Sequence, residues 1–444
     1  MEIKVFYVPG ISHFSYAVIG QKGIAVIDPK REIDDYLKLQ REALLPITHI
    51  LVTHHHADFI SGHILLADAT NAEVRISENT AEGEEIELGD VVIKAVKTPG
   101  HTPEHTSFLL YEKAYGLNTP FAVFSGDSLF SGDVGRPDLF GPEMQEELTR
   151  ALFETVSKYK KLPEHTLVYP AHGAGSFCGK KLSQRCPTTI GYEKLNNPML
   201  RCRDYGEFTS LLFKHMPTPP PYYFTTSKRN RTESGLNREP ARLKSLPLKT
   251  LADKTKTVID LRDQAAFAAY HIPGSLNIAA DAHFATGAGF ALNPENEIVL
   301  VGSPADIAYA RSILYMMGFD KISGLVEDAV ESWRKAALPH ESFPYLPPEK
   351  AFNLVKEDKA VIVDVRTESE YEEEHIPSAL HIPLVKLKAQ IDKLPRNRLI
   401  IFQCGHGCRG SLAASILQRE GFPNVANMAG GLLAWKAKGF PVNT

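Results

Sequence analysis

The sequence has few cysteines and no long apolar run. Only five cysteines occur among 444 residues, and a sparse, odd set does not build the disulfide framework of a small secreted domain. We therefore expect reduced thiols in a cytoplasmic protein. No apolar stretch approaches the roughly 20 residues of a membrane-spanning helix, and Met1–Phe14 lacks the charged-then-apolar pattern of a signal peptide. The sequence therefore predicts neither membrane insertion nor secretion.

An excess of one charge is also lacking. The formal net charge is -4 and the pI is near 6.5, which give no general attraction to nucleic-acid phosphates. One basic stretch lies among Pro, Ser, Thr and Asn, and we interpret it as a solvated linker rather than a binding patch. It contains Lys228, Arg229, Arg231, Arg238, Arg242 and Lys244. The sequence therefore predicts no nucleic-acid partner.

The length predicts several domains, because one core rarely serves much more than about 150–250 residues. Residues 1–225 contain short apolar runs that end in turn residues, as buried strands do. Residues 226–246 are polar and follow a cluster of prolines, so we interpret them as a linker. Two further domains are expected over residues 247–340 and 341–444, joined by a second proline-rich segment.

The two later domains are copies of one another. The segment Val258–Ile278 reads VIDLRDQAAFAAYHIPGSLNI, and Ile362–Ile382 reads IVDVRTESEYEEEHIPSALHI. An aspartate, an arginine and a His-Ile-Pro motif recur at a constant offset, which indicates an internal repeat. Strands alternate with helical stretches in each copy, so each copy is predicted to be a small parallel α/β domain.

Four loops of the first domain carry histidine or aspartate directly after an apolar strand. Strand-end loops are where functional sites are usually built, and imidazole together with carboxylate suits zinc or iron. His55 is expected to point away from such a site, because side chains alternate at a strand end. The candidate metal ligands are His54, His56, Asp58, His101, Asp127 and His172.

A second candidate site is the loop Cys404–Arg409, between the apolar strand Leu399–Phe402 and a helical stretch. Backbone N–H groups and a helix N-terminus favour a thiolate there, so Cys404 is predicted to be a nucleophile, with Arg409 beside it. The other copy has Gly302 at the position of Cys404, so it is predicted to be a scaffold or recognition domain. We interpret Cys178, Cys186 and Cys202 as ordinary thiols, while an approach of Cys202 to the metal stays open.

The HxHxD, TPGHT, SGD and AHG motifs of the first domain resemble the metallo-β-lactamase fold, an αββα sandwich. Phe59 stands where two-metal members have a histidine, so a mononuclear site is expected. Mononuclear members that act on sulfur are persulfide dioxygenases, and the resemblance implies one Fe(II) per chain, with zinc as the alternative. The ligands it implies are His54, His101 and Asp127. The groups it implies for orienting ligands or bound water are His56, Asp58 and His172.

The segment Gly135–Leu139 also resembles a loop of that family. Arg136 is there either a substrate contact or part of a turn held by Asp138, and both interpretations stay open. The last domain, with its cysteine loop and its His-Ile-Pro motif, resembles rhodanese sulfurtransferases.

The whole chain therefore resembles a persulfide dioxygenase–rhodanese fusion, an α/β multidomain protein. This implies oxidation of a low-molecular-weight thiol persulfide by O₂ to sulfite and thiol, with sulfane sulfur passing through Cys404 to form or use thiosulfate. One alternative is a zinc-dependent hydrolase of thioesters, of glyoxalase II type, with an accessory sulfurtransferase. Another is a non-catalytic sulfur sensor or adaptor. The thiol carrier, the direction of transfer and the oligomeric state, a homo-oligomer included, stay open.

Overall fold

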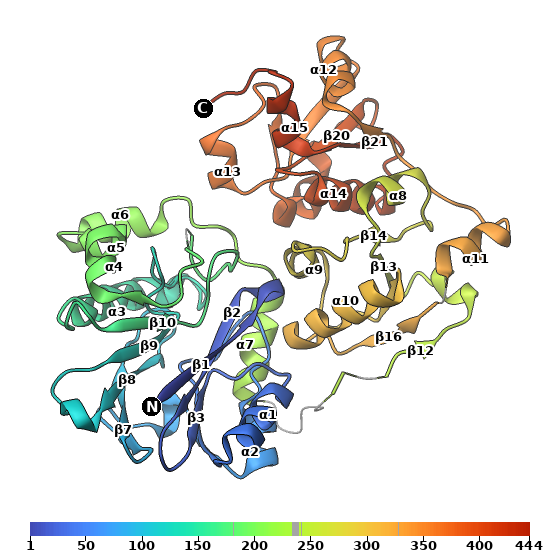
Figure 1. Ribbon diagram of the computed structural model, residues 1–444. Helices are drawn as coiled ribbons and strands as arrows, with labels where there is room; N and C mark the ends of the chain where they lie inside the picture. Colours follow the sequence, from blue (N-terminus) through green and yellow to red (C-terminus); the bar gives the residue numbers. More distant parts are fainter. Residues whose placement is uncertain (181, 233–238, 241, 327) are drawn as a thin grey trace. The chain divides into compact units, whose positions relative to one another are not determined.

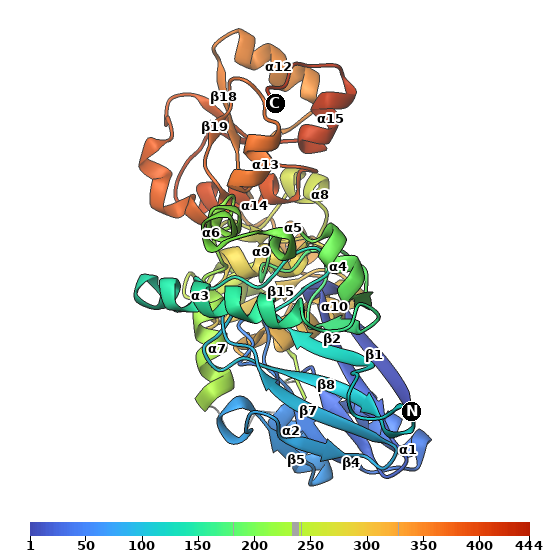
Figure 2. The same cartoon turned by 90° about the vertical axis from the view of Figure 1, so that its left-hand side faces the viewer.

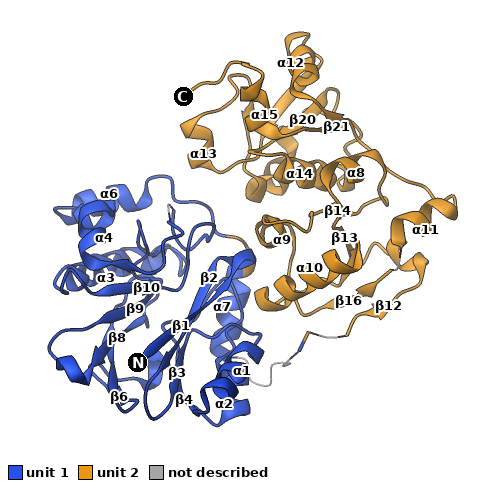
Figure 3. Ribbon diagram, in the orientation of Figure 1, with its two compact units in different colours: residues 1–219, 223–239 blue, residues 220–222, 240–444 orange. Residues whose placement is uncertain are grey.

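The computed structural model describes residues 1–444 apart from 181, 233–238, 241 and 327. The chain forms two compact units, which Figure 3 distinguishes by colour. The first unit contains residues 1–219 and 223–239, and the second contains residues 220–222 and 240–444. None of the described helices is both long and apolar enough to cross a membrane.

The first unit contains two mixed sheets. Strands of the first are β1 (Glu2–Val8), β2 (His13–Ile19), β3 (Ile24–Ile27), β4 (Ile47–Leu51) and β5 (Glu73–Arg75). Strands of the second are β6 (Glu85–Glu87), β7 (Val91–Lys97), β8 (Thr106–Glu112), β9 (Ala122–Gly126), β10 (Leu167–Pro170) and β11 (Thr188–Thr189). The sheet orders are β1-β2-β3-β4-β5 and β11-β10-β9-β8-β7-β6. Figure 2 shows β7 and β8 running side by side.

Helices cover the outer faces of both sheets (Figure 1). They are α1 (Asp34–Ala43), α2 (His63–Thr70), α3 (Pro142–Tyr159), α4 (Ile190–Asn196), α5 (Pro198–Arg201), α6 (Tyr205–Phe213) and α7 (Tyr222–Thr232). Short 3-10 turns occupy Pro9–Ile11, Ser77–Asn79 and Lys113–Tyr115. A central apolar core joins the inner faces of the sheets, for example Tyr16 and Ile27 with Phe108 and Phe124. Two further cores join each sheet to its helices, so the predicted αββα sandwich is confirmed.

Two parallel sheets of one topology make up the second unit. Strands of the first are β12 (Lys244–Ser245), β13 (Thr257–Asp260), β14 (Leu276–Asn277), β15 (Ile298–Val301) and β16 (Ile322–Leu325). Strands of the second are β17 (Tyr345–Leu346), β18 (Ala360–Asp364), β19 (Leu380–His381), β20 (Leu399–Gln403) and β21 (Val425–Met428). Their orders, β12-β16-β15-β13-β14 and β17-β21-β20-β18-β19, correspond strand for strand, which confirms two parallel α/β copies.

Helices connect these strands and follow the last of them. The first copy contains α8 (Gln264–Ala269), α9 (Phe284–Ala291), α10 (Pro304–Met317) and α11 (Ala329–Lys335). The second contains α12 (Pro348–Lys356), α13 (Glu368–Glu373), α14 (Cys408–Arg419) and α15 (Gly431–Ala437). Short 3-10 turns occupy Leu248–Ala252, Leu384–Lys386 and Lys388–Lys393. Below, the two copies are called the middle and the last domain.

The structure differs from the sequence prediction in the linker. A loop was expected from residue 226, but α7 continues to Thr232 and belongs largely to the first unit. The cause is local, because residues 222–232 contain neither proline nor glycine, and the prolines before them end where the helix begins. Arg238, in the same basic stretch, lies outside the described residues. The predicted domain boundaries stay a prediction.

Candidate metal centre and cysteine loop

Three predicted ligands of the first unit lie together at the ends of strands. One ligand atom from each of His54, His101 and Asp127 lies within 4.8 Å of the other two, and all three side chains are buried. Asp127 Oδ2 is 3.7 Å from His54 Nε2 and 3.6 Å from His101 Nε2. Atoms that lie this close together are spaced as the ligands of one ion are.

Hydrogen bonds leave one atom of each ligand turned toward the common point. Thr53 Oγ1 donates to Asp28 at 2.8 Å, so it accepts from His54 Nδ1 at 2.9 Å, and this leaves the lone pair on Nε2. His101 Nδ1 donates likewise to the carbonyl of Arg136 at 2.9 Å. Among the described residues, His54 Nε2 and Asp127 Oδ2 are buried without any hydrogen-bond partner. Buried orphan atoms of this kind fit a metal ion.

His172 holds the carboxylate of Asp127. Its Nδ1 donates to Asp127 Oδ1 at 2.7 Å, and its Nε2 lies 2.8 Å from Asp58 Oδ2. Burial alone would lower the pKa of His172, but the two carboxylates outweigh burial and raise it well above its usual value. Burial would likewise raise the pKa of Asp127, but His172 outweighs it and lowers that pKa. An imidazole with a carboxylate at each nitrogen orients a ligand and is poorly suited to be one itself.

A second group of ligand-type residues adjoins the first. One atom each of His56, Asp58 and His172 lies within 4.8 Å of the others. His56 Nε2 lies 3.2 Å from Asp28 Oδ1, so this side chain also faces a carboxylate. Phe59 is fully buried, with its ring centroid 4.4 Å from that of His56. The apolar ring of Phe59 lies beside this second group and cannot ligate a metal, so the group has no ligand atom at that position.

The cysteine loop of the second unit connects β20 to α14. Cys404 is buried, and the N–H of Gly407 donates to its sulfur at 3.1 Å. Gly407 has φ of 103°, a left-handed conformation that glycine adopts without strain and that turns its N–H back toward the sulfur. The N–H of Leu432 fixes the other side of the loop by donating to the carbonyl of Cys404 at 2.8 Å. The loop therefore presents a donor to sulfur at the start of a helix.

Arg409 pairs with a carboxylate of the same domain. Its guanidinium donates to both oxygens of Glu370, at 2.7 and 2.6 Å. Burial would raise the pKa of Glu370, but Arg409 outweighs burial and lowers that pKa to about 2. The pair is bidentate, which gives Arg409 one orientation. Arg409 therefore lies at the predicted site, and Glu370 is a neighbour that the sequence did not single out.

Comparison with known families assigns the domains in which the two candidate sites lie. Residues 8–83 match the metallo-beta-lactamase superfamily, and residues 246–336 and 348–438 each match the rhodanese-like domain. A hydroxyacylglutathione hydrolase of Rhodospirillum rubrum is 30% identical over 217 residues, which are 46% of this chain and 75% of that protein. A thiosulfate sulfurtransferase GlpE of Coxiella burnetii is 39% identical over 88 residues, 20% of this chain and 82% of that protein. The chain therefore belongs to the metallo-beta-lactamase superfamily and to the rhodanese-like family.

A solved structure agrees with this assignment over most of the chain. A metallo-beta-lactamase from Staphylococcus aureus subsp. aureus COL is 32% identical, with a TM-score of 0.67, and the match covers 73% of this chain and 98% of that one. The metallo-β-lactamase fold binds metal ions, which agrees with the ligand groups described above. Both families are enzymatic, as hydrolases and sulfurtransferases.

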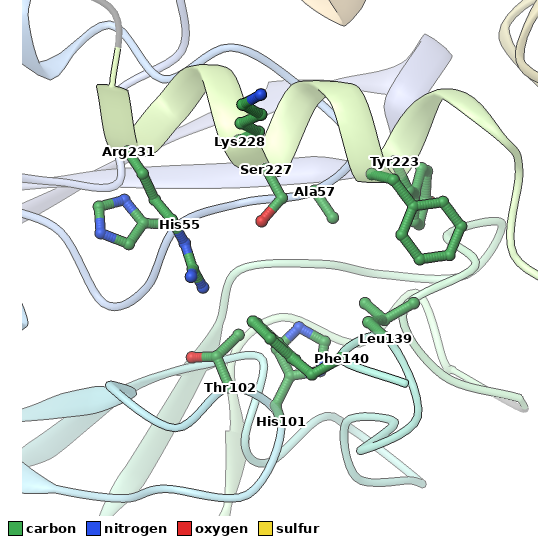
Figure 4. Close-up of a pocket in the computed structure, with 11 residues that line it drawn as sticks. His55, Ala57, His101, Thr102, Leu139, Phe140, Tyr223, Ser227, Lys228 and Arg231 are labelled. Atoms are coloured by element: carbon green, nitrogen blue, oxygen red, sulfur yellow. The ribbon is translucent and has the colours of Figure 1, made fainter. Parts of the chain in front are cut away.

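A cavity of about 250 Å³ in the metallo-β-lactamase domain extends from the ligand His101 to helix α7 (Figure 4). Figure 4 shows Arg231 reaching from α7 toward the opposite wall, which carries Phe140. The guanidinium carbon of Arg231 lies 5.0 Å from the Phe140 ring centroid, and Lys228 also lines the cavity. Two residues of the basic stretch therefore border the candidate site. Both are exposed, as expected, but they lie on a helix, so the expected loop is corrected at these positions.

Asn230 fastens α7 to the metal loop. Its Nδ2 donates to the carbonyls of His56 at 2.7 Å and Phe59 at 2.8 Å, and its Oδ1 accepts from the N–H of Ser61 at 2.9 Å. Sequence reasoning missed this residue because its partners lie about 170 positions earlier. No local signal in the sequence identifies Asn230.

His55 lies between His54 and His56 in the sequence. It bonds Glu78 at 2.8 Å and belongs to neither ligand group.

Sequence reasoning also missed His105. The N–H of Asp127 donates to His105 Nε2 at 3.1 Å, so Nδ1 carries the proton and donates to Thr98 Oγ1 at 2.8 Å. Burial lowers the pKa of His105 to about 3, which agrees with a neutral ring. His105 therefore supports the backbone of a ligand. Its position four residues after His101 was the available signal.

Arg136 takes the turn interpretation. Its guanidinium forms a two-point contact with Asp138, at 2.7 Å for each bond, and donates to the carbonyl of Phe177 at 3.2 Å. The side chain is buried and does not line the described cavity beside His101. Its carbonyl orients His101, so the residue acts on the site through its backbone.

Cys178, and not Cys202, lies beside the ligand set. One ligand-type atom each of Cys178, Asp127 and His172 lies within 4.8 Å of the others. Cys202 instead follows α5, where its thiol donates to the carbonyl of Pro198 at 3.4 Å. The interpretation of Cys178 as an ordinary thiol overlooked this proximity, because the loop after His172 brings it back toward the site.

Proposed function

We propose that this chain oxidises a low-molecular-weight thiol persulfide with O₂ and carries sulfane sulfur on Cys404. The first reaction is R–S–SH + O₂ + H₂O → R–SH + SO₃²⁻ + 2H⁺. The second is Cys404–S–SH + SO₃²⁻ → Cys404–SH + S₂O₃²⁻, or its reverse. Sulfite leaves one reaction and enters the other, and covalent linkage raises its concentration near the second site.

The observation that carries the proposal is the set of three ligands, each with one atom directed at a common point. Two imidazoles and one carboxylate form the ligand set that non-haem Fe(II) oxygenases use, and iron bound there would supply open positions for persulfide and O₂. Phe59, in place of a further ligand, supports a single metal. Around the ligands, His172 fixes Asp127, and the carbonyl of Arg136 fixes His101.

The cavity beside His101 supports an anionic carrier. Its wall is largely apolar, and its charged residues at α7 are the basic Lys228 and Arg231. A planar guanidinium suits carboxylate or phosphate groups of a thiol such as a peptide or nucleotide derivative. We propose that Arg231 binds the carrier and holds the persulfide end toward His101. Arg231 lies 3.5 Å from Glu104, and on binding it would exchange this carboxylate for an anionic group of the substrate.

A zinc-dependent thioester hydrolase is the second candidate. Two facts favour it: the second ligand group of His56, Asp58 and His172, and the relatedness to a hydroxyacylglutathione hydrolase. A hydrolase of that type would need two metals, and the carboxylates at His172 and the ring of Phe59 oppose the second. A non-catalytic sensor is disfavoured because the ligand set and the nucleophile loop are both intact.

The test is metal content and O₂ uptake of full-length protein purified without air. We expect one iron per chain and O₂ consumption with a persulfide substrate. Asp127→Ala should lose iron and reduce O₂ consumption by at least about 100-fold, because a ligand matters no less than the groups that orient it. Cys404→Ser is the matched control and keeps O₂ consumption. Two zinc ions per chain, with thioester hydrolysis, would establish the second candidate instead.

The carrier is tested in the same assay. Arg231→Gln should raise KM for an anionic persulfide and leave KM for a neutral alkyl persulfide unchanged. The control is Arg229→Gln, which removes a charge from the same helix at a position that does not line the described cavity. Equal effects of the two variants would mean that Arg231 acts only through net charge.

A further inference from the structure

The thiol of Cys408 is held by side chains of the middle domain. Gln264 Nε2 donates to Cys408 Sγ at 3.2 Å, and the thiol donates to Asp281 Oδ2 at 3.5 Å. Cys408 is the first residue of α14 and follows the loop of Cys404 directly. A domain without a nucleophile of its own therefore contributes two polar groups to the loop of the other.

A network of bonds keeps these groups in place. Ser411 Oγ donates to Asn277 Oδ1 at 2.6 Å, and the N–H of Asn277 donates to Ser415 Oγ at 3.2 Å. One turn further along α14, Gln418 bonds His271 at 2.9 Å. Helix α14 thus contacts β14 of the middle domain through Ser411 and Ser415, and the segment before β14 through Gln418. These bonds hold the two domains together beside Cys408.

A second thiol beside a persulfide is a hazard. A Cys408 thiolate would attack the inner sulfur: Cys404–S–SH + Cys408–S⁻ → Cys404–S–S–Cys408 + HS⁻. The S–S bond to Cys404 is exchanged for a new one, the sulfane sulfur leaves as hydrogen sulfide, and no external oxidant is needed. This exchange requires a thiolate. Burial, followed by the charge of Asp281, raises the pKa of Cys408 to about 12, so the thiol stays protonated at neutral pH.

We propose that Gln264 and Asp281 are positioning residues for the last domain, which hold the Cys408 sulfur against the middle domain and so prevent it from discharging the Cys404 persulfide. This inference rests on the proposed sulfur-carrying role of Cys404. It gives the cysteine-less domain a function, which is to protect the carried sulfur until an acceptor arrives.

The experiment loads full-length protein with thiosulfate without air, removes the excess, and follows the protein by intact mass and released sulfide. Wild type should retain one added sulfur on Cys404. Asp281→Ala should lose it at least about tenfold faster, the factor by which one unit of thiol pKa changes the thiolate fraction. The loss should produce equal amounts of hydrogen sulfide and of a Cys404–Cys408 disulfide. Gln264→Ala should act more weakly and only by releasing the sulfur from the middle domain, because the lost N–H donor did not itself oppose the thiolate.

The decisive control adds Cys408→Ser to Asp281→Ala, which should restore the wild-type lifetime of the persulfide. A merely structural effect of Asp281→Ala would not be reversed in this way. Asp253→Ala, which removes an exposed carboxylate of the same domain bonded to Thr255, should leave the lifetime unchanged. An unchanged lifetime in Asp281→Ala, or failure of Cys408→Ser to restore it, would overturn the inference. Absence of added sulfur in wild type would refute the sulfur-carrying role itself.

Discussion

The middle and last domains share a scaffold and differ in one loop. In each, an aspartate at the end of a central strand pairs with an arginine two residues later. Arg262 Nη2 donates to Asp260 Oδ2 at 2.6 Å, and Arg366 Nη2 donates to Asp364 Oδ2 at 2.7 Å. The sheets have the same order and the same parallel pairing. The fold was therefore kept in both copies.

The loops after the corresponding strands β15 and β20 show the difference. Asp260 lies opposite Val301, and Asp364 lies opposite Gln403, so the next residues, Gly302 and Cys404, correspond. In the middle domain α10 begins only two residues later, whereas four residues precede α14. The shorter loop consists of Gly302 and Ser303, so it contains no thiol and no turn like that of Gly407.

The largest expected effect is that of Cys404→Ser on sulfur transfer. If only one domain carries sulfur, the variant should lose thiosulfate–cyanide transfer by at least about 10³-fold, because the nucleophile is removed. Cys408→Ser is the matched control and should keep most of the activity. Substantial transfer in Cys404→Ser would mean that another group of this chain carries sulfur, and the comparison of the two domains would fail.

Removing one arginine from each scaffold sharpens the comparison. Arg366 is nearly fully buried with Asp364, so Arg366→Ala should destabilise the last domain by about 3–5 kcal/mol. Arg262 is 24% exposed although Asp260 is buried, so in Arg262→Ala water can take the place of the guanidinium, and the middle domain should lose about 1–3 kcal/mol. Urea unfolding measures the loss in the free energy of unfolding for both variants.

The chain supplies a separate fluorescent probe for each of the two rhodanese-like domains. Its two tryptophans are Trp333 in the middle domain and Trp435 in the last, and both are buried. A Trp435→Phe background reports on the middle domain, and a Trp333→Phe background reports on the last. Equal losses of stability in the two arginine variants would contradict the expectation that the more buried arginine contributes more to stability.

The smallest effect is expected from restoring the cysteine alone. Gly302→Cys in a Cys404→Ser background should give no sulfur transfer, because the two-residue loop cannot direct N–H groups at the sulfur. A Cβ at Gly302 would lie 2.9 Å from Leu261 Cβ, so a destabilisation of about 1–3 kcal/mol is expected. Recovered transfer would show that the thiol, and not the loop, was the missing part.

Much of this architecture was predictable because its signals are local. The repeat identified two parallel domains, and the strand-end motifs identified six candidate ligands, from which the family resemblance selected His54, His101 and Asp127. Cys404 and Arg409 lie within one short loop, so their sequence neighbours sufficed. Prediction was wrong for the first part of the linker, where α7 borders the candidate site, because a basic, polar segment has the same composition whether it is solvated or lines a cavity.

The sequence by itself determined which residue types follow each strand, the internal repeat, and the replacement of a nucleophile by Gly302. Only the tertiary structure decided which distant groups hold the metal loop and the thiol of Cys408 in place. Asn230 reaches the metal loop from about 170 positions away, and Asp281 reaches Cys408 across 127 positions. Such contacts depend on how helices and sheets pack, and a single side chain carries no periodic or spacing signal of its distant partner.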